Sequence, residues 1–132
     1  MKTRLAVVLG SAALLAIPML AHHSFSAEYD AQKKVTLTGT VTKVEWMNPH
    51  ARFYVDVKDD KGQVTNWEFE LGSPNGLMRA GWSRNSMKEG DVVTVEGNAA
   101  KDGSNLANAR TVKLADGKRL FGASSAEDPA TK

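Results

Sequence analysis

The chain has 132 residues, of which 42% are hydrophobic, with 17 basic side chains, 15 acidic side chains and no cysteine. This length suits one small domain, and the lack of cysteine excludes disulfides and thiolate metal sites. Binding of nucleic acid needs clustered surplus positive charge, which this composition does not supply, so we expect no nucleic-acid partner.

The first 21 residues have the pattern of a secretory signal peptide. Lys2 and Arg4 precede an almost uncharged run that ends at the small residue Ala21, the expected cleavage position. Without this segment the chain has 15 basic and 15 acidic residues and is formally neutral. An uncleaved membrane anchor is the alternative, because the run is nearly long enough to span a bilayer. Export without cysteine predicts a periplasmic location, with no membrane association after cleavage.

The mature chain is predicted to begin with an N-terminal extension, residues 22–34, followed by a strand over 35–46. β-branched residues alternate along this strand, and Gly39 within it indicates a bend or bulge. A loop follows, because Asn48 before Pro49 disfavours helix and favours a turn.

Residues 51–58 and 63–71 both alternate apolar and polar side chains and are separated by a turn that contains Gly62. This pattern predicts a β-hairpin, with Gly62 at a position of positive φ.

A short helix is expected after the hairpin. Ser73 can cap it, Pro74 suits its first position, and Gly81 can end it. Leu77 and Met78 are expected to form its apolar face.

Strands are predicted over 92–97 and 106–114, with a short segment over 118–121 and a disordered tail over 122–132. The resulting order predicts a mainly β domain over 35–121. We expect a small five-stranded OB-like Greek-key barrel with one short helix between strands 3 and 4, and an open sandwich is the alternative. This architecture hosts many unrelated ligands, so it does not by itself predict a function.

Three segments resemble a known family. "HHSFSAEYD" follows the signal peptide, "VEWMNPH" ends the first strand, and "NWEFELGSPNGLMRAGWSRNSMKEGDVVTVEG" continues to the fourth. Together they resemble a family of uncharacterised bacterial periplasmic proteins, a domain of unknown function, over residues 22–121. The resemblance implies export and a single small domain, and it implies no catalytic residues.

The three histidines are the candidate metal ligands. If cleavage follows Ala21, the α-amino nitrogen and ring of His22 can chelate one ion, and His50 can complete a three-nitrogen brace. Nitrogen ligands of this kind favour copper over zinc. Such a brace is similar to the copper site of oxidative polysaccharide monooxygenases, which have a different fold. His23 could instead bind copper with the terminal amine and the intervening amide.

Other interpretations of the histidines stay open. A cut one residue earlier would make His23 the third residue, a spacing suited to Cu(II) or Ni(II). His22 and His23 could also be solvated tail residues, with His50 stabilising only a turn. The acidic residues available as further ligands or as acceptors that orient imidazoles are Glu28, Asp30 and Glu45.

A second group of side chains could bind a small ligand. Arg79, Trp82 and Arg84 lie close together in sequence and combine positive charge with an aromatic ring, which suits an anionic or sugar-like ligand. Trp46 and Asn48, beside the Asn-Pro-His loop, complete the predicted ligand-binding set. The competing interpretation is that Trp82 closes one end of the domain and the arginines remain in water.

The sequence contains no motif for a catalytic nucleophile or a phosphate-binding loop. We therefore expect a periplasmic binding or accessory protein more than an enzyme, with copper or, less favoured, zinc bound at His22, His23 and His50. The alternative is an OB-like module that binds a small anionic ligand, a polysaccharide or a periplasmic protein partner without metal. A copper-dependent redox enzyme is a third hypothesis.

Overall fold

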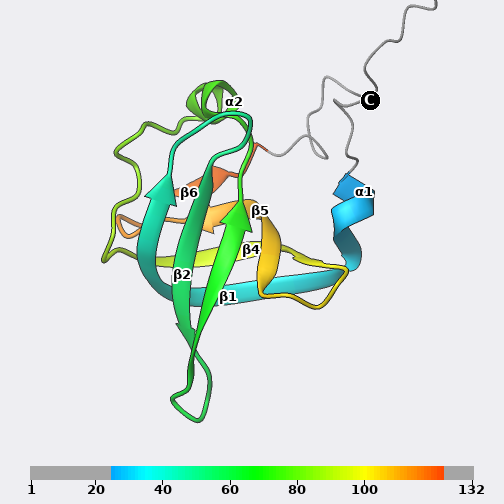
Figure 1. Cartoon of the computed structure of the whole chain (residues 1–132). Coiled ribbons are helices and arrows are strands. Elements are labelled where there is room, and N and C mark those ends of the chain that lie inside the picture. The colour runs from blue at the N-terminus through cyan, green and yellow to red at the C-terminus, as the bar shows by residue number, and fades with distance from the viewer. Residues whose placement is uncertain (1–24, 124–132) are drawn as a thin grey trace, which may run out of the picture.

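A computed structural model describes residues 25–123 of the chain, and this part is mainly β (Figure 1). Six strands form one sheet in the order β3–β2–β1–β4–β5–β6, and β3 also pairs with β5. In chain order the elements are α1 (Phe25–Glu28), β1 (Tyr29–Glu45), β2 (Arg52–Lys58), β3 (Val64–Glu70), α2 (Pro74–Arg79), β4 (Val92–Ala100), β5 (Leu106–Lys113) and β6 (Arg119–Phe121).

Strand β1 is the longest strand and pairs with two neighbours. Its first part pairs with β4 from Tyr29 to Thr40, and its second part pairs with β2 from Gly39 to Glu45. At the overlap, a Cβ on Gly39 would lie 2.1 Å from the carbonyl oxygen of Asp56, so only glycine lets the two strands approach this closely. The sequence predicts a bend or bulge at Gly39; β1 passes there from one partner strand to the other, and its register against β2 shifts two residues further on, between Val41 and Lys43.

β1 begins six residues earlier than the sequence pattern predicts. Tyr29 pairs with Ala100 and Lys34 pairs with Asn98, with an irregular register between them. The segment was expected to be an extension because charged and polar residues interrupt the alternation there. Backbone pairing with β4 forms the strand despite the weak side-chain pattern.

The predicted hairpin is confirmed. β2 and β3 pair antiparallel from Arg52↔Glu70 to Lys58↔Val64, and Gly62 in the connecting turn has a φ of 79°. The hairpin projects beyond the rest of the sheet, as Figure 1 shows. Its two stacked rings, Phe53 and Phe69, are fully buried.

Helix α2 forms where the sequence predicts it. Gly76 N–H donates to the Ser73 side chain over 3.1 Å, which caps the helix, and Gly81 follows it with a φ of 98°. Leu77 is buried, but Met78 is 53% exposed, so only one of the two residues of the expected apolar face packs inward. The helix has only six residues and therefore turns little of its surface towards the core.

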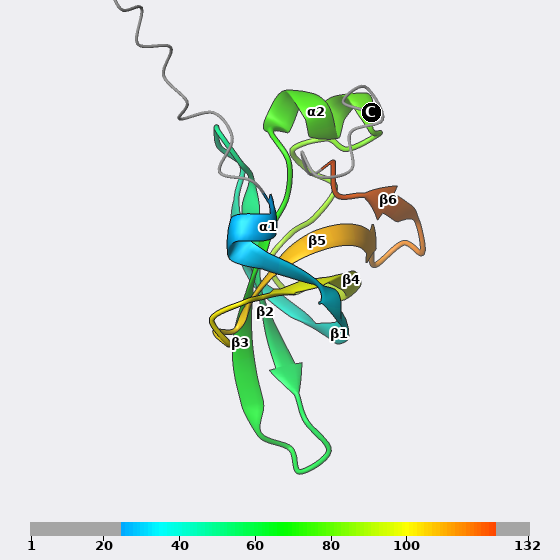
Figure 2. The same ribbon diagram turned by 90° about the vertical axis from the view of Figure 1, so that its right-hand side faces the viewer.

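The main core lies between the inner faces of the strands, which cross one another in Figure 2. Apolar side chains at alternating positions fill it, as the period of two along each strand requires. Trp46 and Trp67 pack partly buried against it. The largest fully buried side chains are Phe53, Phe69, Leu77, Val41, Val55, Val93, Val95 and Val112.

The C-terminal segment joins the fold at Gly122, a residue that the sequence pattern assigns to the disordered tail. Gly122 is buried; its N–H donates to Arg110 O over 2.7 Å, and its own carbonyl accepts from Gly72 N–H over 2.8 Å. A Cβ there would lie 1.9 Å from the Ala109 carbonyl oxygen. A run of small and polar residues predicts a disordered tail. At Gly122, however, the lack of a side chain allows the backbone to pass between the segments at Arg110 and at Gly72.

Candidate functional site

Of the three predicted metal ligands, only His50 lies in the described part of the chain; His22 and His23 lie outside it. The His50 side chain is 37% exposed, and its Nδ1 lies 3.2 Å from the carbonyl oxygen of Leu71. A carbonyl oxygen can only accept, so Nδ1 carries the proton in this contact. In the neutral ring Nε2 then has a free lone pair, which is the form that binds a metal ion.

Glu70 is the carboxylate next to this ring. Its Oε1 lies 4.0 Å from His50 Nδ1, its Oε2 accepts from the hydroxyl of Tyr29 over 3.1 Å, and its side chain is only 12% exposed. Arg52 Nη2 lies 3.4 Å from the same Oε2. We call His50, Glu70, Arg52, Glu68 and Tyr29 the histidine–carboxylate cluster.

Arg52 is shared between the two carboxylates of the cluster. Its Nη1 lies 2.5 Å from Glu68 Oε1, a closer contact than the 3.4 Å to Glu70. The hairpin register creates this arrangement, because Arg52 pairs directly with Glu70 and side chains two residues apart on β3 share a face. The two carboxylates and one guanidinium leave the cluster with a formal charge of −1 when His50 is neutral.

Tyr29 connects the cluster to α1. It is 2% exposed, and burial, followed by the charge of Glu70, raises its pKa above the usual range. The Phe25 ring centroid lies 5.5 Å from that of Tyr29. The Tyr29 hydroxyl, at the start of β1, bonds to Glu70 at the end of β3. The start of the described chain therefore lies close to the cluster.

The three acidic residues considered from the sequence have different surroundings. Burial, and next the charge of Glu70, raise the pKa of Glu28, so Glu28 is near the cluster. Glu45 forms an ion pair with Lys43 over 2.6 Å, and Asp30 accepts from the backbone N–H of Gln32. Within residues 25–123, no three or more His, Cys, Asp or Glu side chains gather as a metal site would require.

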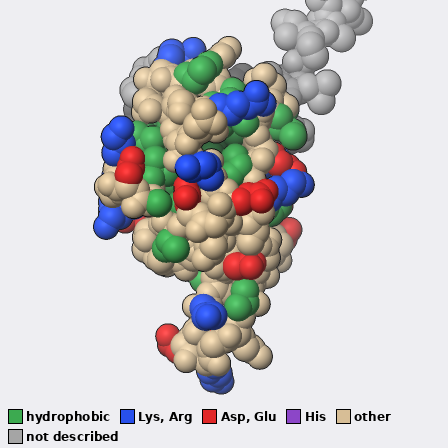
Figure 3. Space-filling model, turned by 90° about the vertical axis from the view of Figure 1, so that its left-hand side faces the viewer, with side chains coloured by type: hydrophobic (Ala, Val, Ile, Leu, Met, Phe, Trp, Pro, Cys, Tyr) green, Lys and Arg blue, Asp and Glu red, His purple; other side chains and the backbone are tan. Residues whose placement is uncertain are grey.

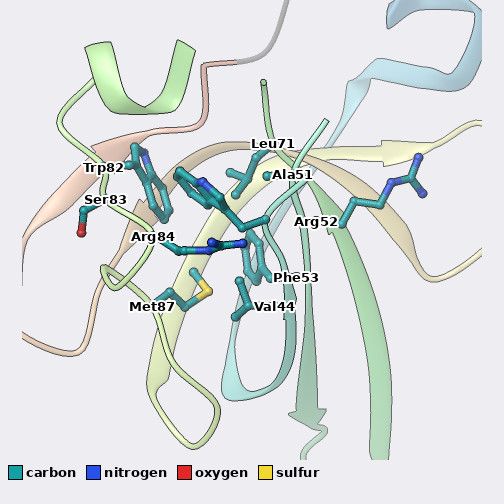
Figure 4. Close-up of a pocket in the computed structure, with 10 residues that line it drawn as sticks. Val44, Ala51, Arg52, Phe53, Leu71, Trp82, Ser83, Arg84 and Met87 are labelled. Carbon is teal, nitrogen blue, oxygen red and sulfur yellow. The ribbon is translucent and has the colours of Figure 1, made fainter. Parts of the chain in front are cut away.

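The predicted ligand-binding residues are only partly brought together. Trp46, Trp82 and Arg84 line one small pocket, whose empty space holds about one water molecule. Arg84 points into the group formed by Trp82 and its apolar neighbours, whereas Arg52 points away from it (Figure 4). The remaining lining residues are Val44, Ala51, Arg52, Phe53, Leu71, Ser83 and Met87.

Trp82 has a structural role in this pocket. It is 4% exposed, and its indole N–H donates to the carbonyl oxygen of Phe121 over 2.8 Å. This arrangement matches the interpretation that Trp82 closes one end of the domain. Asn48 and Arg79 are exposed and do not line the pocket, so the structure does not unite the five residues in one site.

Sequence reasoning missed Glu70, Glu68, Arg52 and Tyr29. A usable signal was present in the hairpin itself, because pairing the two predicted strands around Gly62 places Arg52 opposite Glu70. Tyr29 gave no such signal, since it lies in the segment expected to be an extension.

Elsewhere on the surface, charges of both signs are mixed. The face in Figure 3 has acidic and basic side chains interspersed with apolar ones, without a large patch of one sign. In the part of the chain with described coordinates, no helix has the length and apolar character needed to cross a bilayer.

These features define a small, mainly β domain with a loop histidine next to two carboxylates that share one face of β3. The chain belongs to the family of unknown function DUF6152, whose model matches residues 10–109. No curated protein sequence matches the chain.

Three solved structures show a limited similarity. A mitochondrial single-stranded DNA binding protein from S. cerevisiae, Rim1, has 13% identity and a TM-score of 0.49, over 62% of this chain and 92% of that one. TiaS in a complex with a tRNA and ATP has 20% identity and a TM-score of 0.46, over 61% and 18%. A ZRD-deleted TiaS mutant with agmatine has 21% and 0.45, over 71% and 23%. Such low values do not bear on what this chain binds.

Proposed function

We propose that this protein is exported to the periplasm through its first 21 residues and there binds a metal ion, copper in preference to zinc. The ligands are His22, His23 and His50. The observation that carries the proposal is the hydrogen bond from His50 Nδ1 to the Leu71 carbonyl oxygen, at 3.2 Å. It fixes the ring and its tautomer, as partners of metal-binding histidines commonly do, and leaves Nε2 for the metal.

The length of the chain supports the participation of the N-terminal histidines. Phe25 packs on Tyr29, and Tyr29 bonds to Glu70, which neighbours His50. Three residues of chain reach at most about 10 Å, so the chain length between Phe25 and His22 allows His22 to take part in a site at the cluster. Cleavage after Ala21 would add an α-amino nitrogen to the ligand set, and nitrogen ligands favour Cu(II).

The domain that supports this site is, in our proposal, a five-stranded OB-like Greek-key barrel. The pairings support it, because β3–β2–β1–β4–β5 form a chain of neighbours and β5 returns to β3 through a short parallel ladder, Glu68↔Leu106 to Glu70↔Asn108. The helix α2 between β3 and β4 is also in the expected position.

The proposal is tested on protein purified from the periplasm of an expression host. We expect an intact mass that begins at His22 and close to one bound copper per chain by elemental analysis. His22→Ala and His50→Gln should each weaken Cu(II) binding by about 100-fold, because each removes one ligand nitrogen, a larger effect than loss of a supporting residue.

His23→Ala distinguishes the two ways in which nitrogen atoms could bind copper. It leaves the three-nitrogen brace of His22 and His50 intact, but it removes the imidazole that the competing geometry combines with the terminal amine and the intervening amide. The matched control is His50→Gln in apo form, whose thermal stability shows whether the domain still folds. A mass that begins beyond His23, or wild-type protein that does not bind added copper or zinc, would refute the proposal.

One observation favours the metal-independent alternative. Trp46 and Arg84 also line an open groove with Lys88 and Glu89, where an aromatic ring and two cations face solvent. A groove with a half-buried aromatic ring, two cations and one carboxylate suits a small anionic ligand, a polysaccharide or a protein partner. An NMR titration with inorganic phosphate and with a soluble oligosaccharide should shift the Trp46 and Arg84 signals; unchanged spectra at millimolar concentration contradict this alternative.

A further inference from the structure

We infer that the open groove beside Trp46 binds a hexuronate, which is a sugar ring that carries a carboxylate, and that Arg84 holds this carboxylate. The inference rests on the metal-independent alternative of the proposed function and names the ligand of that alternative. The histidines take no part in it, so copper binding and hexuronate binding are separate properties. The residues that define this Trp46 groove are Val44, Trp46, Arg84, Met87, Lys88 and Glu89.

Arg84 lies in a short loop that is anchored at both ends. The residues on either side of the loop, Trp82 and Met87, are 4% and 5% exposed. Between them the N–H of Ser83 donates to Ser86 Oγ over 2.8 Å, and the N–H of Ser86 donates to the Ser83 carbonyl oxygen over 3.1 Å. These bonds close a turn that positions the Arg84 backbone before a ligand arrives, which lowers the entropic cost of binding.

The guanidinium of Arg84 has no protein partner within the described residues. Arg52 and Arg119 each form an ion pair with a glutamate, whereas Arg84 forms neither an ion pair nor a hydrogen bond with any residue of 25–123. Although the residue is exposed, its side chain is directed towards Trp82 and the apolar neighbours of that ring (Figure 4). The planar fork of a guanidinium matches the two oxygens of a carboxylate, so a ligand carboxylate can complete this site.

Trp46 supplies the surface for the sugar ring. It lines both the Trp46 groove and the small pocket next to it, and it packs partly buried against the core. Its indole N–H donates to no acceptor in the described part of the chain, whereas that of Trp82 donates to the carbonyl oxygen of Phe121 over 2.8 Å. An indole combines a flat apolar face with one donor. Trp46 can therefore contact the C–H face of a sugar and donate to one of its oxygens.

The charges of the groove favour an acid sugar over a simple anion. Arg84 and Lys88 are positive and Glu89 is negative, so two cations and one carboxylate leave a formal charge of +1. This surplus suits a ligand with a single carboxylate. Glu89 can only accept hydrogen bonds, so it suits the hydroxyl groups of a sugar and repels a ligand of higher negative charge. The groove has a volume of about 470 Å³, which is in the range of small-ligand sites.

The test is isothermal titration calorimetry on the exported protein after removal of metal with a chelator. The probes are galacturonic acid, its trisaccharide, galactose and inorganic phosphate. We expect galacturonic acid to bind at least about 10-fold more tightly than galactose or phosphate, because only the acid sugar engages both Arg84 and Trp46. A trisaccharide that binds more tightly than the single sugar identifies a polysaccharide as the source of the hexuronate, and equal affinity identifies a free sugar.

Three variants assign the contacts. Arg84→Gln should weaken galacturonate binding by about 10- to 100-fold, the effect of losing hydrogen bonds to a charged group, and should change galactose binding by less than about threefold. Arg84→Lys keeps the charge without the fork and should recover only part of the loss. Trp46→Phe keeps a ring but removes the N–H donor, and it should weaken both sugars by about three- to 10-fold.

The matched control is Lys61→Gln, which removes one positive charge in the turn of the β2–β3 hairpin, outside the groove, and should leave the affinity for every probe unchanged. The inference is wrong if galactose or phosphate binds as tightly as galacturonate, or if Arg84→Gln binds galacturonate like the wild type, although binding at the groove then stands. If no probe binds at millimolar concentration, the metal-independent alternative fails and the inference fails with it. Copper binding by Arg84→Gln should equal that of the wild type, which keeps the metal proposal separate.

Discussion

Gly39→Ala is the substitution that tests the double pairing of β1. The added Cβ would lie 2.1 Å from the Asp56 carbonyl oxygen, where an unstrained carbon–oxygen contact is about 3.3 Å, so β1 and β2 must separate by about 1 Å. Overpacking costs about 1 to 3 kcal/mol, and two weakened ladder bonds add about 1 kcal/mol each. We expect the free energy of unfolding to fall by about 3 to 5 kcal/mol, a large part of a small domain's stability.

Urea unfolding followed by tryptophan fluorescence measures this loss. The matched control is Gly76→Ala in α2, where the Cβ would meet only side-chain atoms, the nearest being Ser73 Oγ at 3.2 Å. Alanine favours the helix by about 1 kcal/mol, so this variant should stay within about 1 kcal/mol of wild type. A loss below about 1 kcal/mol for Gly39→Ala would refute the close approach of β1 and β2 at this residue.

Two further predictions concern one charge and one hydrogen bond. Glu28 has a raised pKa in the folded protein, so its ionised form disfavours folding at neutral pH; Glu28→Gln should raise the melting temperature at pH 7, and the gain should vanish as the pH falls below about 4.5, where wild-type Glu28 is protonated in both states. A gain that persists at pH 3.5 would contradict this cause. Trp82→Phe removes the indole donor to Phe121 and should cost about 2 to 3 kcal/mol in urea unfolding followed by circular dichroism, and a cost below about 0.5 kcal/mol would contradict it.

The parts of the fold that follow from local patterns were predictable. Alternation marked the β2–β3 hairpin, and Ser73 and Pro74 marked the start of α2, because capping and strand periodicity depend on residues close in sequence. The bend at Gly39 was also predictable, since a glycine within an otherwise β-branched strand commonly marks a bend or the close approach of another backbone.

The parts that depend on distant neighbours were not predictable. The strand over 29–34 exists because β4 pairs with it, and Gly122 is buried because the backbone at Ala109 leaves no room for a side chain. The candidate site shows the same limit: His50 stood out by residue type, but the hydrogen bond between Tyr29 and Glu70 joins residues 41 positions apart. Side-chain type alone does not reveal such a partner.

The position of Gly122 between two backbone segments also determines how late in synthesis the folded domain can be completed. Its N–H donates to the carbonyl oxygen of Arg110 in β5, and its carbonyl accepts from the N–H of Gly72 after β3, so one residue near the end of the domain joins two segments made much earlier. A chain that emerges N-terminus first, from a ribosome or an export channel, lacks this junction until residue 122 has passed. Completion of the native structure is therefore a late event in biosynthesis. The two long-range hydrogen bonds of Gly122 can form only after nearly the whole chain has been made.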